Sequence, residues 1–186
     1  MRTLVFLLEE RSAAEMLKVI LPRILPSDIE TFFITFEGKN DLENNVERKI
    51  RCWCQPDSCF VVMRDQDSGD CRQIKGQLLR KCANTRKQDD VLVRIACHEL
   101  ESFYLGDLLA VEKAYGLHLP SQQNRKYREP DKLSNAADEL KKLTKQKYQK
   151  IDGSRRIAEY LQLDGSNCST SFNMLISGIK RLVAKW

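Results

Sequence analysis

The sequence predicts an α/β protein: a compact sheet of about four mostly parallel strands, flanked by helices, with a C-terminal helical appendage. Two observations support this prediction. Short apolar runs rich in strand-forming residues alternate with segments of helical periodicity over residues 3–115. From residue 116 onward only helical periodicity returns. We therefore expect residues 1–115 to form the α/β core and residues 116–186 a helical extension packed on it, in a single domain overall.

The first two strand–helix pairs are expected within residues 3–53. The run TLVFLL (3–8) predicts a strand, and the apolar residues of 12–25 recur at helical spacing. Ser12 is placed to cap this helix, and Pro22 should end or kink it. A second strand is expected at IETFFITF (29–36). Gly38 separates it from a second helix over residues 40–53.

The next two pairs complete the core. CFVVM (59–63) predicts the most buried strand, and the helix at 70–82 should turn Ile74, Leu78 and Leu79 inward. VLVRIAC (91–97) predicts the fourth strand. Residues 116–130 form a loop, and short helices follow at 135–143, 154–161 and 169–186, with Ser154 and Ser169 as caps.

Composition indicates a soluble chain that holds its fold without disulfides. Of 186 residues 42% are hydrophobic, and no apolar run approaches the roughly 18 residues of a membrane span. The run 4–8 is too short for a signal peptide and is followed by two glutamates, so we expect a cytoplasmic protein. The seven cysteines favour reduced thiols. Zinc binding through Cys52, Cys54 and Cys59 is the alternative, although a second ligand pair is missing.

Positive charge is concentrated in one segment. The formal net charge is +5, and residues 121–156 alone contain 11 Lys and Arg residues against five Asp and Glu residues. Such a segment suits a phosphate-rich partner. A solvated helix face is the alternative interpretation.

Acidic residues follow three of the predicted strands. They are Glu9, Glu10, Asp65, Asp67, Glu99 and Glu101. Because the carboxyl ends of parallel strands meet at one edge, where ligands of such sheets bind, these acids should lie together. Clustered carboxylates repel, and oxygen ligands suit Mg²⁺ or Mn²⁺. The pattern therefore indicates a metal site for phosphate chemistry, with ordinary turn and cap residues as the alternative.

Two other interpretations of DQDSGDC (65–71) fit poorly. A calcium-binding EF-hand loop needs Gly at its sixth position and Glu at its twelfth, where this chain has Asp70 and Gly76. A haloacid-dehalogenase-like phosphatase needs a later acidic pair after a strand, whereas Asp89 and Asp90 precede one.

Glutamate after the first strand and Asp-x-Asp after the third, in a compact parallel unit, resemble the Toprim domain of topoisomerases, bacterial primases and OLD-family nucleases. The chain is more closely similar to a bacterial family with a Toprim-like fold, the domain-of-unknown-function 4276 family. The stretches that carry this resemblance cover nearly the whole chain: LEERSAAEML, FEGKNDL, FVVMRDQDSGDC, RIACHELESFYLGD, YQKIDGSRRIAEYL and STSFNMLISGIKRL.

The resemblance implies roles for individual residues. Glu9 matches the Toprim glutamate, a general acid/base or metal ligand, and Asp65 with Asp67 matches the metal-binding pair. Glu99 and Glu101 match acids of the closer family. Glu10 stands where Toprim domains usually have glycine, and could compete with Glu9 for the metal.

Basic residues complete the expected site. Lys150 is expected to act in catalysis with Glu9, and a lysine near the metal would pair with the scissile phosphate. The residues expected to contact nucleic acid are Lys39, Arg125, Lys126, Arg128, Lys147, Lys150, Arg155 and Arg156. His98 is expected to make a structural hydrogen bond, and Trp53, Phe103 and Tyr104 to lie in the core.

Together these features predict a Mg²⁺- or Mn²⁺-dependent nuclease, or a related phosphoryl-transfer enzyme, acting on DNA or RNA. Relatives are often encoded beside an ATPase of the ABC/SMC type, which implies such a partner and a role in phage defence. The alternative is a non-catalytic module that binds nucleic acid or docks on the ATPase.

Overall fold

The computed structural model describes residues 2–186 and contains one four-stranded sheet with strand order β2-β1-β3-β4. All three strand pairs are parallel, as the alternating pattern predicted. The strands are β1 (Arg2–Leu8), β2 (Ile29–Thr35), β3 (Ser58–Asp65) and β4 (Val91–Ala96). The predicted α/β class is therefore confirmed.

The two central strands are apolar because both of their faces are covered. Leu4, Phe6 and Leu8 of β1 face one core, whereas Val5 and Leu7 face the other, and all five are fully buried. Each such side chain contributes roughly 1.5–3 kcal/mol of transfer free energy when buried. Continuous apolar runs of this kind are typical of parallel sheets with helices on both sides.

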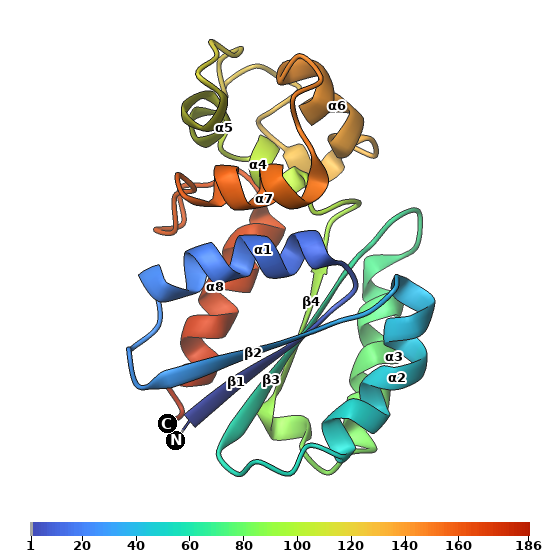
Figure 1. Ribbon diagram of the computed structural model, residues 1–186. Coiled ribbons are helices and arrows are strands. Elements are labelled where there is room, and N and C mark those ends of the chain that lie inside the picture. The colour runs from blue at the N-terminus through green and yellow to red at the C-terminus, as the bar shows by residue number, and fades with distance from the viewer. Residues whose placement is uncertain (1) are drawn as a thin grey trace.

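Two helices cover each face of the sheet (Figure 1). One face carries α2 (Lys39–Arg51) and α3 (Cys71–Ala83), and the other carries α1 (Arg11–Ile20) and α8 (Thr170–Val183). Pro22 lies in a short 3-10 turn, Leu21–Arg23, so it ends α1 as expected. The last helix thus belongs to the layers of the sheet, although it is distant from the strands in sequence.

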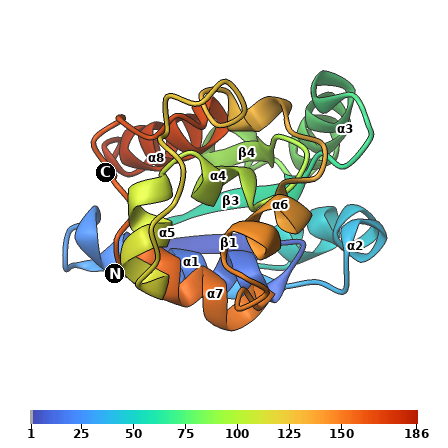
Figure 2. The ribbon, with the colours of Figure 1, turned by 90° about the horizontal axis from the view of Figure 1, so that it is seen from above.

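A group of short helices lies over the carboxyl ends of the strands (Figures 1 and 2). We call this group, residues 102–161, the cap. Its helices are α4 (Ser102–Leu105), α5 (Leu108–Tyr115), α6 (Ala136–Leu143) and α7 (Lys150–Ala158). The predicted loop at 116–130 lies between α5 and a 3-10 turn, Pro130–Lys132. The basic segment 121–156 is therefore part of the cap.

Three local expectations were wrong. Glu10, not Ser12, precedes the first turn of α1, and the Ser12 hydroxyl lies inside the helix and donates to Glu10 Oε2 at 3.0 Å. Ser154 lies within α7, because that helix begins four residues earlier, and its hydroxyl donates to the Lys150 carbonyl. Leu79 is 44% exposed, because only one face of α3 meets the sheet.

Ser169 does cap α8, since its hydroxyl accepts the Phe172 N–H at 3.1 Å. Within residues 2–186, none of the helices combines the length and the apolar character that crossing a bilayer requires.

Candidate metal and phosphate site

Four carboxylates gather where the sheet meets the cap, and we call them the acidic rim: Glu9, Glu10, Asp65 and Glu101. Glu9 and Glu10 directly follow β1, Asp65 is the last residue of β3, and Glu101 immediately precedes α4. Strands β1 and β3 are neighbours, and the helices that follow them, α1 and α3, pack on opposite faces of the sheet. The rim thus lies at a topological switch point, where parallel sheets bind ligands.

Glu9 and Asp65 are joined directly. The backbone N–H of Asp65 donates to Glu9 Oε2 at 2.9 Å, so the glutamate is held against the end of β3. Glu9 is only 9% exposed. Burial raises the pKa of Glu9, although the Asp65 N–H and the Arg64 charge act in the opposite direction. This carboxylate therefore lies in an environment that disfavours its charge.

The environment of Asp65 is more unfavourable still. Burial, and after it the negative charges of Glu101, Glu9 and Glu10, hold the pKa of Asp65 well above its usual range. Like charges that repel in a partly dry site are stabilised by a proton or by a cation. Asp65 is thus the rim residue with most to gain from a bound cation.

Arg64 is the charged centre beneath the rim, and sequence reasoning missed it. Its side chain is buried, pairs with Glu43, and lies 3.8 Å from Glu9 Oε2 and 3.3 Å from Asp67 Oδ2. Its Nε also donates to the Asp65 carbonyl at 2.7 Å. An arginine inside the apolar run CFVVMRD was the available signal, because a buried guanidinium requires several acceptors.

Asp67 lies beside the rim, where cations hold it. Its Oδ2 accepts from Lys39 Nζ at 2.9 Å as well as from Arg64. The backbone at Asp67 has φ 54°, and its N–H donates to the His98 carbonyl at 2.8 Å. His98 Nδ1 lies 3.2 Å from the Asp67 carbonyl, so this histidine makes the structural contact expected of it. The two aspartates of DQD therefore have different surroundings.

Glu101 reaches the rim from the cap side. It is 1% exposed, and its Oε1 accepts from the Tyr148 hydroxyl at 2.9 Å. Its Oε2 is buried and has no hydrogen-bond partner within residues 2–186, and the same is true of the Tyr104 hydroxyl. Burial raises the pKa of Glu101, opposed by Lys150 and by the Tyr148 hydroxyl. A buried carboxylate oxygen without a donor is what a cation or an ordered water would satisfy.

Lys150 closes the rim from above. As the first residue of α7, it donates from Nζ to both carboxylate oxygens of Glu10, at 3.0 and 3.1 Å. Burial acts to lower the pKa of Lys150, but the carboxylates of Glu101, Glu10 and Asp65 raise it overall. Lys150 is therefore a protonated cation directly above the acids, as its predicted role requires.

Glu99 is engaged elsewhere. Its Oε2 accepts the backbone N–H of Ala137 at 2.7 Å, so it caps the first turn of α6. The structure does not bring this carboxylate into the acidic rim with Glu101, although both follow β4.

The predicted nucleic-acid contacts are all exposed, and all but Lys39 lie on the cap. Some are already paired: Lys126 with Glu139 at 2.6 Å, Arg155 with Glu15 at 2.6 Å and Arg156 with Asp152 at 4.0 Å. Within the part of the chain that the structure describes, no ion pair involves Arg125, Arg128 or Lys147. These three remain available to an external anion.

Three residues of the rim, Glu9, Glu10 and Asp65, line a hollow of about 10 Å³ together with Arg64, whereas Glu101 lies outside it. That is about the volume that one water or one small ion occupies. Across residues 2–186, no three or more histidine, cysteine and acidic side chains are arranged to hold a metal ion by themselves. The rim as it stands would therefore provide fewer than three protein ligands.

The cysteines considered for zinc are free thiols in different environments. Cys52 and Cys54 are exposed in the loop before β3, at the amino ends of the strands and away from the cap, whereas Cys59 is buried in β3. Burial raises the pKa of Cys59 to about 11, which disfavours the thiolate that zinc requires.

The family model described as "Domain of unknown function (DUF4276)" matches residues 8–180, which include every element from the end of β1 through most of α8. No curated protein and no solved structure matches the chain.

Proposed function

This chain belongs to the DUF4276 family, whose model matches residues 8–180, and we propose that it is a divalent-metal-dependent nuclease or related phosphoryl-transfer enzyme with a Toprim-like site. We propose that it acts on nucleic acid in the cytoplasm. The observation that carries the proposal is the pairing of Glu9 and Asp65 at the junction of β1 and β3, beneath a basic cap.

The residues present fit Mg²⁺ or Mn²⁺ that is bound through few protein ligands. Mg²⁺ commonly keeps several waters and binds through one or two carboxylates plus the phosphates of its substrate. Asp65 and Glu9 would supply these carboxylates, and the free Oε2 of Glu101 would hold a coordinated water. A metal bound there would neutralise charge on the phosphate and lower the pKa of a water. The Asp67 carboxylate would bind the metal only after its ion pairs with Lys39 and Arg64 are broken.

The chain's own side chains would position the substrate. Among residues 2–186, the Lys150 ammonium pairs with Glu10 alone, across a partly exposed contact, so a phosphate oxygen would replace that carboxylate at little cost. Arg64 fixes Glu9 and the end of β3 from below. Arg125, Arg128 and Lys147 would contact the phosphate backbone along the cap.

The decisive experiment compares wild type with the Asp65→Asn, Asp67→Asn double variant. Calorimetric titration of Mn²⁺ is run with and without a short nucleic-acid duplex or single strand, and cleavage of the same probes is followed. We expect wild type to bind metal more tightly with nucleic acid, because phosphates complete its coordination, and the variant to lose both binding and cleavage.

The matched control is Asp89→Asn with Asp90→Asn. These two exposed aspartates directly precede β4, at the amino ends of the strands and away from the rim. This variant should behave like wild type. Equal metal binding by both double variants would contradict the assignment of the rim.

The second candidate function is a non-catalytic module that binds nucleic acid or docks on an ABC/SMC-type ATPase. The observation in its favour is that Lys39 and Arg64 already neutralise Asp67. If the chain is such a module, the Asp65→Asn, Asp67→Asn variant should still bind nucleic acid or the ATPase. It should also keep the cellular activity of wild type, such as phage defence. Loss of the cellular effect with binding intact supports the enzyme.

A further inference from the structure

The two edges of the sheet differ in how their backbone groups are covered. An edge strand exposes unpaired N–H and C=O groups, and proteins usually block such an edge with charges, proline, bulges or a covering element. Strand β4 forms one edge and β2 the other. The two edges are protected to different degrees.

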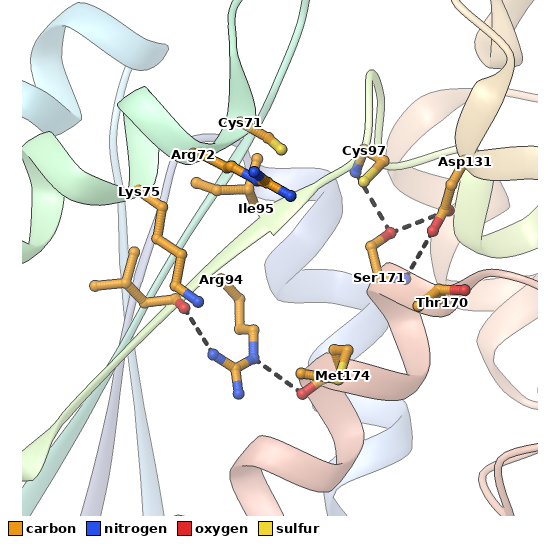
Figure 3. A pocket seen from close by; sticks show the side chains of 11 residues that line it. Cys71, Arg72, Lys75, Arg94, Ile95, Cys97, Asp131, Thr170, Ser171 and Met174 are labelled. Carbon is orange, nitrogen blue, oxygen red and sulfur yellow. Dashed lines mark hydrogen bonds between the residues drawn. The ribbon is translucent and has the colours of Figure 1, made fainter.

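Side chains and α8 close the β4 edge (Figure 3). Arg94 donates to the Val93 carbonyl and to the Met174 carbonyl of α8, each at 2.9 Å, so its guanidinium bridges strand and helix. Beyond the strand, the Cys97 N–H donates to the Ser171 hydroxyl at 3.4 Å. The Val93 carbonyl and the Cys97 N–H are therefore already bonded and are not free to pair with an additional strand.

The β2 edge is less protected within residues 2–186. Lys18 of α1 lies nearby, with its Nζ 5.9 Å from the centre of the Phe33 ring, on the α1 face of the sheet. The sequence of β2, IETFFIT, has no proline and a single charged residue, Glu30. Phe32, at its centre, is 52% exposed. The Phe36 N–H donates to the Leu8 carbonyl at 2.9 Å, so the backbone groups of Phe36 point toward β1. The direction of the backbone N–H and C=O groups alternates from one residue of a strand to the next. The backbone groups of Thr31, Phe33 and Thr35 therefore point away from β1. The open edge is thus a row of free donors and acceptors beside an exposed aromatic ring.

We propose that a second copy of this chain occupies the β2 edge, pairing antiparallel with β2 across a two-fold axis to give a continuous eight-stranded sheet. A register centred on Phe32 pairs all seven residues, with Phe32 opposite Phe32 of the other copy. It sets Thr31 opposite Phe33, a hydrogen-bonded pair whose backbone groups both point outward. It also sets Glu30 opposite Ile34, so no like charges meet.

The surroundings of the edge fit this occupant. On the α1 face, Thr31 and Phe33 line a groove of about 320 Å³ together with Leu21, Leu25 and Pro26. The inward side chains of an added strand would project into this groove, which apolar residues such as Phe33 of the second copy would fill. On the other face, Phe32 already packs edge-on against Trp53, and a second Phe32 would extend that cluster.

The first test is the mass of the protein in solution, by sedimentation velocity or light scattering over a concentration series. We expect wild type to have twice the mass of the chain, and Thr31→Pro and Phe32→Lys to have the mass of a single chain. The proline removes an N–H that faces away from β1, so the β1–β2 pairing stays intact. Leu79→Lys, which changes an equally apolar exposed site on α3, is the control and should remain dimeric.

A cross-link tests the register. Residues directly opposite in a non-hydrogen-bonded antiparallel pair have Cα atoms about 4.5 Å apart, within the range of a disulfide. Phe32→Cys should therefore form a covalent dimer on mild oxidation, with peptide mapping showing the link at position 32, whereas Leu79→Cys should not. A monomeric wild type at every concentration, or a dimer that survives both Thr31→Pro and Phe32→Lys, would overturn the proposal.

Discussion

At the scale of single residues, the site depends on one buried guanidinium. Arg64 contacts Glu43, Glu9 and Asp67, which come from α2, from the end of β1 and from the turn after β3. A cation so placed offsets part of the repulsion between the carboxylates around it, and these carboxylates in turn stabilise the guanidinium, because a buried charge is stable only when it is paired and hydrogen-bonded. It thus fixes Glu9 beside Asp65.

Replacing Arg64 by Met should destabilise the fold by about 3–5 kcal/mol, since removal of one partner leaves buried carboxylates uncompensated. Urea unfolding at neutral pH measures the change. Arg48→Met, at an exposed arginine of α2, is the control and should stay within about 0.5 kcal/mol of wild type. Similar losses in the two variants would show that Arg64 has no special role.

The sequence predicted part of the site at this scale. Glu9 and Asp65 could be placed together because each ends a strand of the same parallel sheet. Glu99 and Glu101 could not be told apart, since both follow β4, and only the tertiary fold brings Ala137 to the first and Tyr148 to the second. Arg64 was missed because its partners are remote in sequence.

At the scale of elements, the cap is joined to the sheet layers through a close backbone approach at Gly106. A Cβ atom there would lie 2.0 Å from Asn167 Oδ1 and 2.7 Å from the Ser169 N–H nitrogen, at the start of α8. Asn167 also donates to the Phe103 carbonyl at 3.0 Å. The junction of α4 and α5 is thereby held against the N-terminus of α8, which supports the cap over the rim.

Gly106→Ala should therefore lower stability by about 1–3 kcal/mol, the usual cost of forcing atoms into a well-packed region. Gly76→Ala provides the opposite case, because Gly76 lies inside α3 with only Arg80 Nη1 near, at 3.7 Å. There alanine should add up to about 1 kcal/mol through helix propensity. Thermal unfolding of both variants measures the contrast, and equal shifts would argue against the close approach.

Element types were easier to predict than element ends. The apolar runs of β1 and β3 are unambiguous because both faces of those strands are buried. Helix starts were less clear, since Ser12 and Ser154 are good cap residues that the fold uses inside helices. Helices were predicted at 135–143 and 154–161, close to α6 and overlapping α7, but nothing local showed that they cover the acids.

At the scale of the whole molecule, the ionised carboxylates of the acidic rim lower the stability of the metal-free fold. The pKa values of Asp65, Glu9 and Glu101 are raised, chiefly by burial, so folding favours their protonated forms. Their contribution to stability is fully present below the unfolded carboxyl pKa, about 4, and is lost as the pH rises through the raised folded values. The metal-free fold should carry this cost at neutral pH.

The thermal midpoint of Asp65→Asn should accordingly exceed that of wild type by an amount that grows between about pH 4 and neutral pH, at about 2–4 °C for each kcal/mol of repulsion removed. Scanning calorimetry in chelator at several pH values measures the difference. Mg²⁺ added at neutral pH should raise the wild-type midpoint only. A pH-independent difference would contradict the origin of the shift.

The distribution of thiols has a practical consequence for labelling. Cys52 and Cys54 are open to solvent on the side away from the cap, while Cys82, like Cys59, has a pKa raised to about 11 by burial and reacts slowly. A maleimide fluorophore would therefore attach first near the turn after α2. Such a dye would sense changes in tumbling when a large molecule binds over the cap, without touching the binding surface itself.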